Sequence, residues 1–382
     1  MTQQTHGPGP LPAFFDERPG DVVPIVTPVG DKMWLVRGYA LGRLVLADAR
    51  FSRAEAVRPG APRLNDAQPV PDSMMSMDGS EHARLRRIVA GTFTTGRVAA
   101  MAPFIERVAD RRLDAVAAAG PGADLMETLA VPLPLEVICS LLGVPPTDGD
   151  LFRTWVEVLF DISASSPRQK ARHRLELTRY MAKLIERKRS EPGEDLITAL
   201  IERHGRAELS MPELVTMGLS LLMAGYETTV GQIGLSVLLL LGEPALRDDL
   251  RAGPAAAVEE LLRRTPSTPL SFPRVAREAV VLGDVTVQPG EGVLVSLLDA
   301  NQDPAVTQGR PGAHLTFGHG PHRCPGAPLA RLQVQIAVER LLSRFPQLRL
   351  AAGEQPVIWK EGLATRGLSR LAVEWQNRPT AQ

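Results

Sequence analysis

The stretch Thr316–Arg331, TFGHGPHRCPGAPLAR, decides how the rest of the sequence is interpreted. It contains Cys324, one of only two cysteines in 382 residues, among three glycines and three prolines. A helix is expected to begin just after Cys324, so its N-terminal amides would lower the pKa of the thiol. A buried structural cysteine and a catalytic thiol assisted by His322 are both compatible with this pattern. A zinc site is disfavoured, because no second cysteine lies at ligand spacing.

The composition excludes several classes of protein. Lys plus Arg and Asp plus Glu both number 43, so the formal net charge is zero. This balance argues against a protein that coats nucleic acid or a membrane. Two cysteines are too few for a disulfide framework and favour a reducing compartment, here the cytoplasm. The N-terminus lacks a basic region followed by an apolar run, and residues 1–12 are expected to form a flexible arm.

The apolar stretch Leu214–Leu241 is long enough to cross a membrane. Glu227 and Gln232 lie in its middle, where a charge would be costly in lipid, so a buried core helix is predicted instead. Ser210 and Glu213 form a capping-box pattern at its start. The remaining patterns predict one domain over 1–382, mainly α with small β-sheets. Strands are expected within 22–36, 272–297 and 348–375, a loop over 58–73, and helices over most of 81–264 and over 328–345.

The loop from Phe317 to Gly326 resembles the haem-binding loop of the cytochrome P450 family, with Phe, Gly, Cys and Gly at the family's spacings. The resemblance implies that Cys324 ligates the iron of haem b. It also implies that the haem lies between the long central helix and the helix after the cysteine loop. Phe317, Gly318, His322 and Gly326 are then expected to contact the haem, with glycines making way for a flat macrocycle.

A second signature, Ala224-Gly-Tyr-Glu-Thr-Thr229, lies in the middle of the long apolar helix. A buried Glu-Thr pair is costly unless it meets water or a polar partner, although a threonine can also bond back to its own helix. The pair resembles the family's acid and alcohol, Glu227 and Thr228, which supply protons during dioxygen activation. Ala224 is expected to leave an open face beside the haem.

Two further signatures concern support of the loop and of the haem edge. Glu260 and Arg263 match the family's Glu-x-x-Arg, which alone could be an ordinary helix-surface ion pair. The segment before Phe317 is shorter than is usual in the family, so Arg310 is predicted to replace the arginine that normally joins this pair, with His314 as second choice. Four cations are expected to bind the haem propionates, against the alternative of ordinary surface charge: His82, Arg86, Arg274 and His322.

Two neighbouring arginines and one proline carry separate expectations. Arg84 and Arg87 are expected either to form a solvated basic face or to belong to a docking patch for an acidic electron-transfer protein. Pro325 has no N–H and so cannot donate a hydrogen bond to the neighbouring sulfur. Fewer donors leave more charge on the ligand, so Pro325→Leu is expected to raise the haem reduction potential; an unchanged or lower potential would contradict this.

The resemblance implies a haem-thiolate monooxygenase that inserts one atom of O2 into a C–H bond of a small, mostly apolar molecule, plausibly in natural-product biosynthesis. Electrons are expected from NAD(P)H through a separate ferredoxin and ferredoxin reductase, with no nucleic-acid or membrane partner. Two alternatives stay open: a haem-thiolate binding or sensor protein, and a non-hydroxylating enzyme for coupling or peroxide-driven oxidation. Substrate contacts are expected from Met223, Leu270, Leu363 and Ala364, from the loop near 58–75, and from the segment near 160–172.

Overall fold

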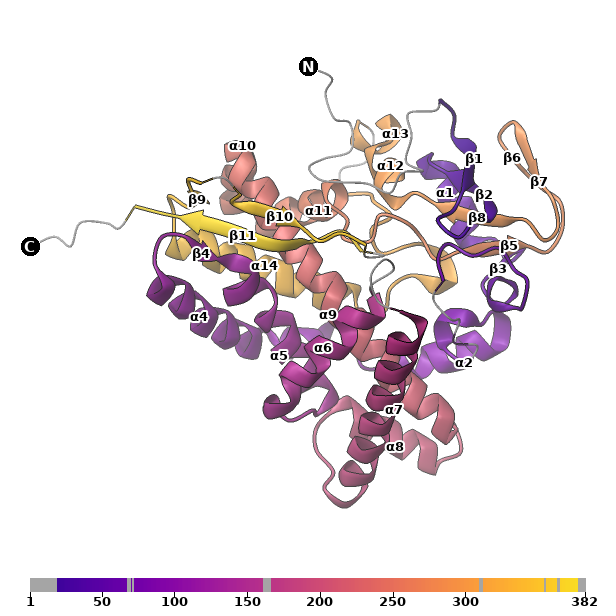
Figure 1. The fold of residues 1–382 in the computed structure, drawn as a ribbon, viewed down its shortest axis with the longest axis horizontal. Helices are drawn as coiled ribbons and strands as arrows, with labels where there is room; N and C mark the ends of the chain where they lie inside the picture. Colours follow the sequence, from indigo (N-terminus) through magenta and orange to yellow (C-terminus); the bar gives the residue numbers. More distant parts are fainter. Residues whose placement is uncertain are drawn as a thin grey trace, which may run out of the picture.

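The computed structural model describes residues 19–66, 70, 72–160, 166–308, 312–353, 355–362 and 365–376. The predicted arm at 1–12 lies outside these ranges, as do Arg310, Leu363 and Ala364. Within them the chain is mainly helical with small β-sheets, as predicted (Figure 1).

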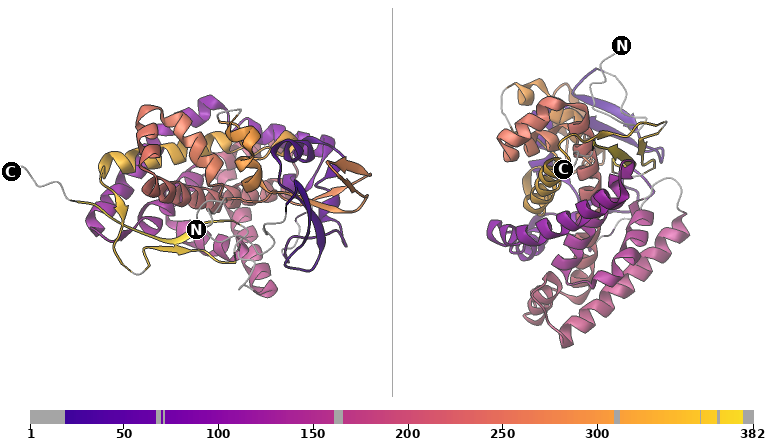
Figure 2. Two further views of the ribbon diagram at one scale, coloured as in Figure 1. Left: turned by 90° about the horizontal axis from the view of Figure 1, so that it is seen from above. Right: turned by 90° about the vertical axis from the view of Figure 1, so that its left-hand side faces the viewer.

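One long helix, α9 (Met211–Gly242), runs through the middle of the molecule (Figures 1 and 2). Its start carries the predicted capping box: the Ser210 hydroxyl accepts a hydrogen bond from the Glu213 amide, and the Glu213 carboxylate accepts one from the Ser210 amide. At 1.5 Å per residue the helix is about 48 Å long. It is apolar enough to cross a membrane, but most of its most apolar window is buried inside the protein, which confirms the predicted core helix.

Helices α5, α7, α8 and α14 pack along α9 and form the main hydrophobic core with it. Their apolar residues recur at helical spacing and so form one face of each helix, which packs against its neighbours. The long polar helix α7 buries only four residues. The helices are α1 (Tyr39–Ala47), α2 (Gly79–Ala90), α3 (Thr95–Ala100), α4 (Ala102–Ala119), α5 (Pro132–Leu142), α6 (Gly149–Phe160), α7 (Pro167–Ser190), α8 (Leu196–Gly205), α9, α10 (Pro244–Ala252), α11 (Pro254–Arg264), α12 (Leu297–Gln302), α13 (Pro304–Thr307) and α14 (Ala327–Arg344). Short 3-10 or π turns cover Glu55–Val57, Met74–Ser76, Met126–Ala130, Pro146–Asp148 and Gly320–His322.

Three small sheets flank the helices. The five-stranded sheet has the order β1-β2-β8-β5-β3, in which β2 and β8 are parallel and the other neighbours antiparallel. A second sheet joins β10, β11 and β4, with β9 also paired to β11, and β6 pairs with β7. The strands are β1 (Val22–Val26), β2 (Lys32–Val36), β3 (Phe51–Ser52), β4 (Ala123–Asp124), β5 (Arg274–Ala276), β6 (Val280–Leu282), β7 (Val285–Val287), β8 (Gly292–Val295), β9 (Arg349–Leu350), β10 (Val357–Trp359) and β11 (Leu368–Glu374).

The predicted strands at both ends of the chain are confirmed, and they lie on opposite sides of α9. Figure 1 shows the β1–β2–β8–β5–β3 sheet on one side and β9–β11 on the other. The sheets therefore flank the central helix rather than forming a separate layer.

Candidate active site

The cysteine loop (Thr316–Gly326) is held in shape by its own backbone. The Cys324 amide donates to the Phe317 carbonyl at 2.8 Å, and the Arg323 amide donates to the Gly320 carbonyl at 3.1 Å. Gly318 and Gly320 have φ of +68° and +69°, a conformation that glycine adopts without strain. The loop ends at Gly326, and α14 begins at Ala327.

The glycines of the loop differ in what surrounds them, and so in the structural reason for having no side chain. A Cβ on Gly320 would lie 2.7 Å from the Ala47 Cα, so this glycine lets the loop pack on the end of α1. At Gly326 an added Cβ would meet the Cys324 Sγ only at 4.0 Å, which is ordinary contact. The expectation that all three glycines make way for a macrocycle is therefore wrong for Gly320, whose neighbour is protein backbone.

The Cys324 thiol is solvent-accessible, although much of the surrounding space is filled by protein. Burial raises the pKa of Cys324, and hydrogen bonds from the Gly326 and Ala327 amides together with the Arg86 charge oppose this without reversing it. The predicted lowering of this pKa by the helix amides is present, but burial outweighs it.

The middle of α9 presents an accessible stretch in an otherwise buried helix. Ala224 is exposed, and Met223, Gly225 and Thr228 are half-buried. The Thr228 hydroxyl donates to the Ala224 carbonyl at 2.6 Å, the local back-bond expected for a threonine in a helix. Gly225 does not share this open face, because a Cβ there would lie 2.8 Å from the Ile138 Cδ1 on α5.

Glu227 points away from the accessible stretch. Its side chain is 1% exposed, and its Oε1 accepts a hydrogen bond from the Lys360 Nζ at 2.8 Å. Lys360 follows β10 and was not singled out from the sequence, since nothing in its local pattern indicates a buried partner 133 residues away. The acid and the alcohol therefore lie on different faces of α9.

Basic side chains from three elements gather beside the cysteine loop. His82 on α2 is buried, and its ring centroid lies 4.1 Å from that of His322. Burial first, then the His322 and Arg86 charges, lower the pKa of His82 to about 4. Arg86 donates to the Arg323 carbonyl. Arg274 on β5 is buried, with its Nη1 3.3 Å from the Phe51 carbonyl; its Nε has no hydrogen-bond partner within the described ranges of the chain.

Two residues of this cluster were missed by the sequence reasoning. Arg53 is buried and donates to the Met75 carbonyl at 2.9 Å; burial and the Arg274 charge lower its pKa to about 9. Asp78 accepts from the Ser52 hydroxyl at 2.5 Å and lies 3.4 Å from the His322 Nε2.

Burial alone would raise the pKa of Asp78. Hydrogen bonds from His322, Ser52 and the Ala54 amide instead hold this pKa well below its usual range. Asp78 stands just before α2, a position that suggests only a helix cap. Its side chain instead holds the 52–54 turn against His322, which sequence reasoning has no means of pairing with it.

Behind the cysteine loop, Arg263 and Glu260 form a two-bond ion pair at 2.7 and 2.6 Å. Arg263 also donates to the Asn301 carbonyl at 2.7 Å. The fully buried Asn301 amide in turn accepts from the Leu315 amide at 2.6 Å and donates to the Thr316 hydroxyl at 2.8 Å. Asn301, also missed, links the ion pair directly to the start of the loop.

Arg310 is predicted to replace the arginine that normally joins the Glu260–Arg263 pair in this family. It lies outside the described residues. The second choice, His314, is wrong: its Nε2 lies 3.0 Å from Glu259, not Glu260. Glu259 also accepts both Arg331 contacts, at 2.5 and 2.9 Å. The Arg331 guanidinium in turn lies 4.5 Å from the Phe317 ring centroid.

Known proteins with similar sequences and structures decide the family. The cytochrome P450 family profile matches residues 255–366. The chain is 40% identical to mycinamicin IV hydroxylase/epoxidase of Micromonospora griseorubida, over 91% of each chain. It is also 40% identical to nocardicin C N-oxygenase of Nocardia uniformis subsp. tsuyamanensis, over 91% of each.

Among solved structures, the mycinamicin VIII C21 methyl hydroxylase of Micromonospora griseorubida, bound to mycinamicin VIII, matches with a TM-score of 0.85 and 35% identity. The match covers 96% of this chain and 97% of that one. This chain belongs to the cytochrome P450 family.

The cytochrome P450 assignment gives the fold its name and makes the protein an oxidoreductase, a monooxygenase of a family that uses haem, O2 and an external electron donor. The residues present fit a haem. Cys324 offers an accessible sulfur, Ala224 is exposed in the middle of α9, and the buried Arg274 Nε has no hydrogen-bond partner among the described residues. An unpaired buried donor is costly, so an acidic group is expected to complete it.

Two of the residues predicted to contact the substrate of this cytochrome P450, Met223 and Leu270, lie within the described residues. Met223 is half-buried beside Ala224 on α9. Leu270 is 7% exposed and packs in a cluster with residues of β1, β2 and β8, and its contact with the substrate stays a prediction. Two residues later Phe272 is 55% exposed, with the Arg53 guanidinium 5.0 Å from its ring centroid.

The expected docking arginines differ from each other. Arg84 is tied to Glu81 at 3.0 Å and also contacts Glu213 and the Glu208 carbonyl, so it braces α2 against the start of α9. Arg87 is exposed.

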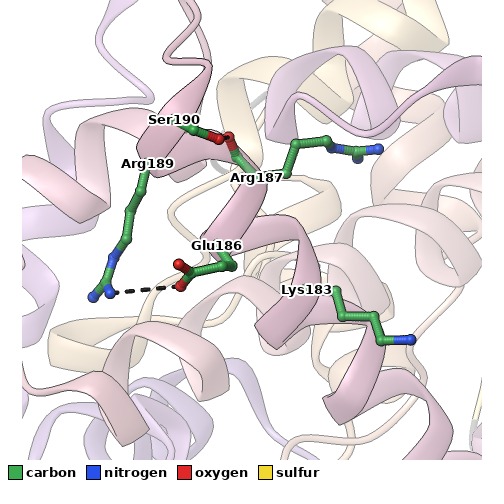
Figure 3. Close-up of a pocket in the computed structure, with 5 residues that line it drawn as sticks. All are labelled: Lys183, Glu186, Arg187, Arg189 and Ser190. Atoms are coloured by element: carbon green, nitrogen blue, oxygen red, sulfur yellow. Dashed lines mark hydrogen bonds and ion pairs between the residues drawn. The ribbon is translucent and has the colours of Figure 1, made fainter.

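Two surface hollows lie outside the cysteine loop. Figure 3 shows the hollow of about 630 Å³ at the end of α7, lined by Lys183, Glu186, Arg187, Arg189 and Ser190. All of its lining belongs to the last turns of α7, away from the cysteine loop, so it is not assigned to the haem site. A second, of about 450 Å³, includes Met77 and Asp78 and borders the basic cluster.

Proposed function

We propose that Cys324 would bind the iron of a haem b held between α9 and α14, in a chain that forms a single catalytic domain over 1–382. The accessible thiol in a loop braced by Asn301 and the Arg263–Glu260 pair is the observation that carries this proposal. The Gly326 and Ala327 amides that hydrogen-bond the sulfur would reduce its charge and so tune the iron.

His82, Arg86, Arg274 and His322 are proposed to bind the haem propionates. The unpaired Nε of buried Arg274 supports this role most directly, because a carboxylate would satisfy both its charge and its hydrogen bond. Asp78 and Arg53 are proposed to orient His322 and Arg274 rather than to meet the haem. Phe317, Gly318 and Gly326 are proposed to line the haem face nearer to the loop, and Ala224 the opposite face.

When bound, the haem supplies the activation of dioxygen that inserts one oxygen atom into a C–H bond. The protein's own residues orient the substrate, exclude water and move protons. The Thr228 hydroxyl, one turn from Ala224 on the accessible face, would donate protons to the reacting dioxygen in place of its bond to the Ala224 carbonyl. Glu227 is proposed to replenish the proton of Thr228.

The substrate is proposed to be a medium-sized, mostly apolar natural product, because the relatives named above act on mycinamicins and nocardicin C. Met223 and Phe272 supply accessible apolar surface for it; Leu363 and Ala364 stay as proposals from the family resemblance. Electrons are proposed to come from NAD(P)H through a ferredoxin and its reductase, in the cytoplasm.

The experiment is a carbon monoxide difference spectrum of the reduced, haem-loaded protein, followed by a spectral-shift screen of natural-product precursors. We expect the long-wavelength Soret band of a thiolate-ligated haem, and hydroxylated product from the compound with the largest shift when a surrogate ferredoxin and reductase are supplied. A Soret band typical of histidine ligation would overturn the ligand assignment. A thiolate spectrum in a protein that forms no product from any compound of the screen would favour the sensor alternative.

A further inference from the structure

The residues of α9 around its accessible stretch point in two directions. Ala224 and Thr228 are one turn apart and share the accessible face. Glu227 precedes Thr228 by one residue, which is about 100° around the helix, and its side chain is 1% exposed. An acid that serves Thr228 must therefore be held close to it without sharing its face.

Lys360 is the group that holds Glu227. Its Nζ lies 2.8 Å from the Glu227 Oε1, and its side chain is 16% exposed, so it lies between the buried carboxylate and solvent. Such a pair differs from the many exposed ion pairs of this protein, such as Arg172–Glu176, which are worth little because water screens them. A buried carboxylate that loses its cation is left with a large desolvation cost.

The backbone fixes the position from which Lys360 reaches α9. The Lys360 amide donates to the Gly367 carbonyl at 3.0 Å, closing the end of the β10–β11 hairpin. The Arg366 carbonyl oxygen would lie 2.6 Å from a Cβ on Gly231, so the hairpin rests against the helix backbone at that glycine. Gly231 is one turn after Glu227, and the Arg366 amide donates to the Ser267 carbonyl at 2.7 Å. Both partners of the ion pair therefore extend from segments that pack against each other at Gly231.

We propose that Lys360 is a positioning residue for dioxygen activation, which orients the Glu227 carboxylate so that it can take up a proton from the solvent side and pass it to Thr228. The inference rests on the proposed proton-supplying function of Glu227. It places part of the proton machinery on the C-terminal hairpin, although the motif that carries the acid lies 133 residues earlier in the chain.

The ion pair itself is tested by a double-mutant cycle on the haem-loaded protein, using Lys360→Met, Glu227→Gln and the double variant. Lys360→Met is expected to lower the melting temperature by roughly 3 to 6 °C, because it leaves a buried carboxylate without its cation. The double variant should melt higher than Lys360→Met, since the uncompensated charge is gone. Losses that simply add would show that the two side chains do not interact, and would overturn the proposal.

The positioning role is tested by the product formed per NADPH, with the compound of largest spectral shift from the screen described above. Lys360→Met is expected to lower this ratio about tenfold and to raise hydrogen peroxide release correspondingly, because a positioned acid contributes at least about 100-fold to its step. The effect should vanish in a Glu227→Gln background, and Lys360→Arg should recover most of the ratio. Arg370→Met, on the exposed face of the same hairpin, is the matched control and should behave like the parent.

An unchanged ratio of product to NADPH in Lys360→Met would overturn the positioning role and leave a purely structural ion pair. A weaker spectral shift with an unchanged ratio would also overturn it, and would indicate that Lys360 contacts the substrate. These results are separable from failure of the proposed function. If the parent lacks the thiolate spectrum, the function fails while the stability cycle still reports on the pair.

Discussion

The two cysteines of this chain occupy opposite environments. Cys139 lies on α5 in the main apolar core, where burial raises its pKa to about 12. Cys324 is accessible, and hydrogen bonds from two backbone amides and a nearby guanidinium partly offset the same effect of burial on its pKa. The difference teaches that desolvation alone makes an inert thiol, whereas donors and an open face make one available to a metal.

The largest expected effect that tests this contrast is that of Cys324→Ser, compared with Cys139→Ala. Cys324→Ser should lose the thiolate spectrum and lower product formation more than about 100-fold, since even the hydrogen-bonding partners of metal ligands are worth about 10- to 100-fold. Spectra and turnover of the two variants, measured side by side, give the answer. A Cys324→Ser protein that keeps the thiolate band would remove the basis of the comparison.

The bracing behind Cys324 is expected to have the next largest effect. Arg263→Met breaks the part-buried pair with Glu260 and the buried bond to the Asn301 carbonyl, and should cost about 2 to 3 kcal/mol of unfolding free energy together with much of the bound haem. Haem content and denaturant unfolding measure both effects.

The neighbouring Arg264→Met is the control for that change. Arg264 pairs with Glu243, whose side chain is 40% exposed, and the loss should stay within about 1 kcal/mol. Equal losses in the two variants would show that Arg263 has no special connection to the cysteine loop.

The polar surroundings of Cys324 also predict a pH dependence that the core around Cys139 does not share. Because the pKa of folded Asp78 is depressed, its ionised form adds stability above its unfolded-state pKa of about 3.9. This stability is lost as the pH falls from there towards the folded pKa. The melting temperature of Asp78→Asn should therefore lie furthest below that of the parent near neutral pH, and the gap should narrow below pH 4.

Asp48→Asn serves as the comparison for Asp78, because the Asp48 carboxylate pairs only with exposed Arg50 among the contacts described here. Its gap from the parent should be smaller at every pH. A gap for Asp78→Asn that is constant with pH would mean that its ionised form does not contribute to stability.

The smallest effect is expected at Cys139 itself. Cys139→Ala removes one buried sulfur and should cost about 1 kcal/mol, with the spectrum and the turnover of the parent. Denaturant unfolding and the carbon monoxide spectrum check the two parts. A change in spectrum would show that the core around α5 influences the haem site more than its packing suggests.

Sequence patterns predicted whatever depends on neighbouring residues. The capping box of α9, the strand pairs and the Glu260–Arg263 pair at i and i+3 all follow from local spacing, and the loop motif pointed to Cys324. Lys360, Asp78 and Asn301 were missed because their partners are distant in the chain. His314 was misassigned because only the packed structure distinguishes Glu259 from its neighbour Glu260 as its partner.

Asn301 has a consequence for how the chain assembles. Its amide joins α11, α12 and the start of the cysteine loop through hydrogen bonds between residues that are 14 to 38 positions apart. The strand before α12, β8, also pairs with β2, which lies most of the sequence away. Contacts within and between sequence-adjacent helices close small loops and form early, whereas long-range pairings are slow. We expect the α4–α9 bundle to fold first and the pocket around Cys324 to be completed last, so that cofactor uptake reports the final step of folding.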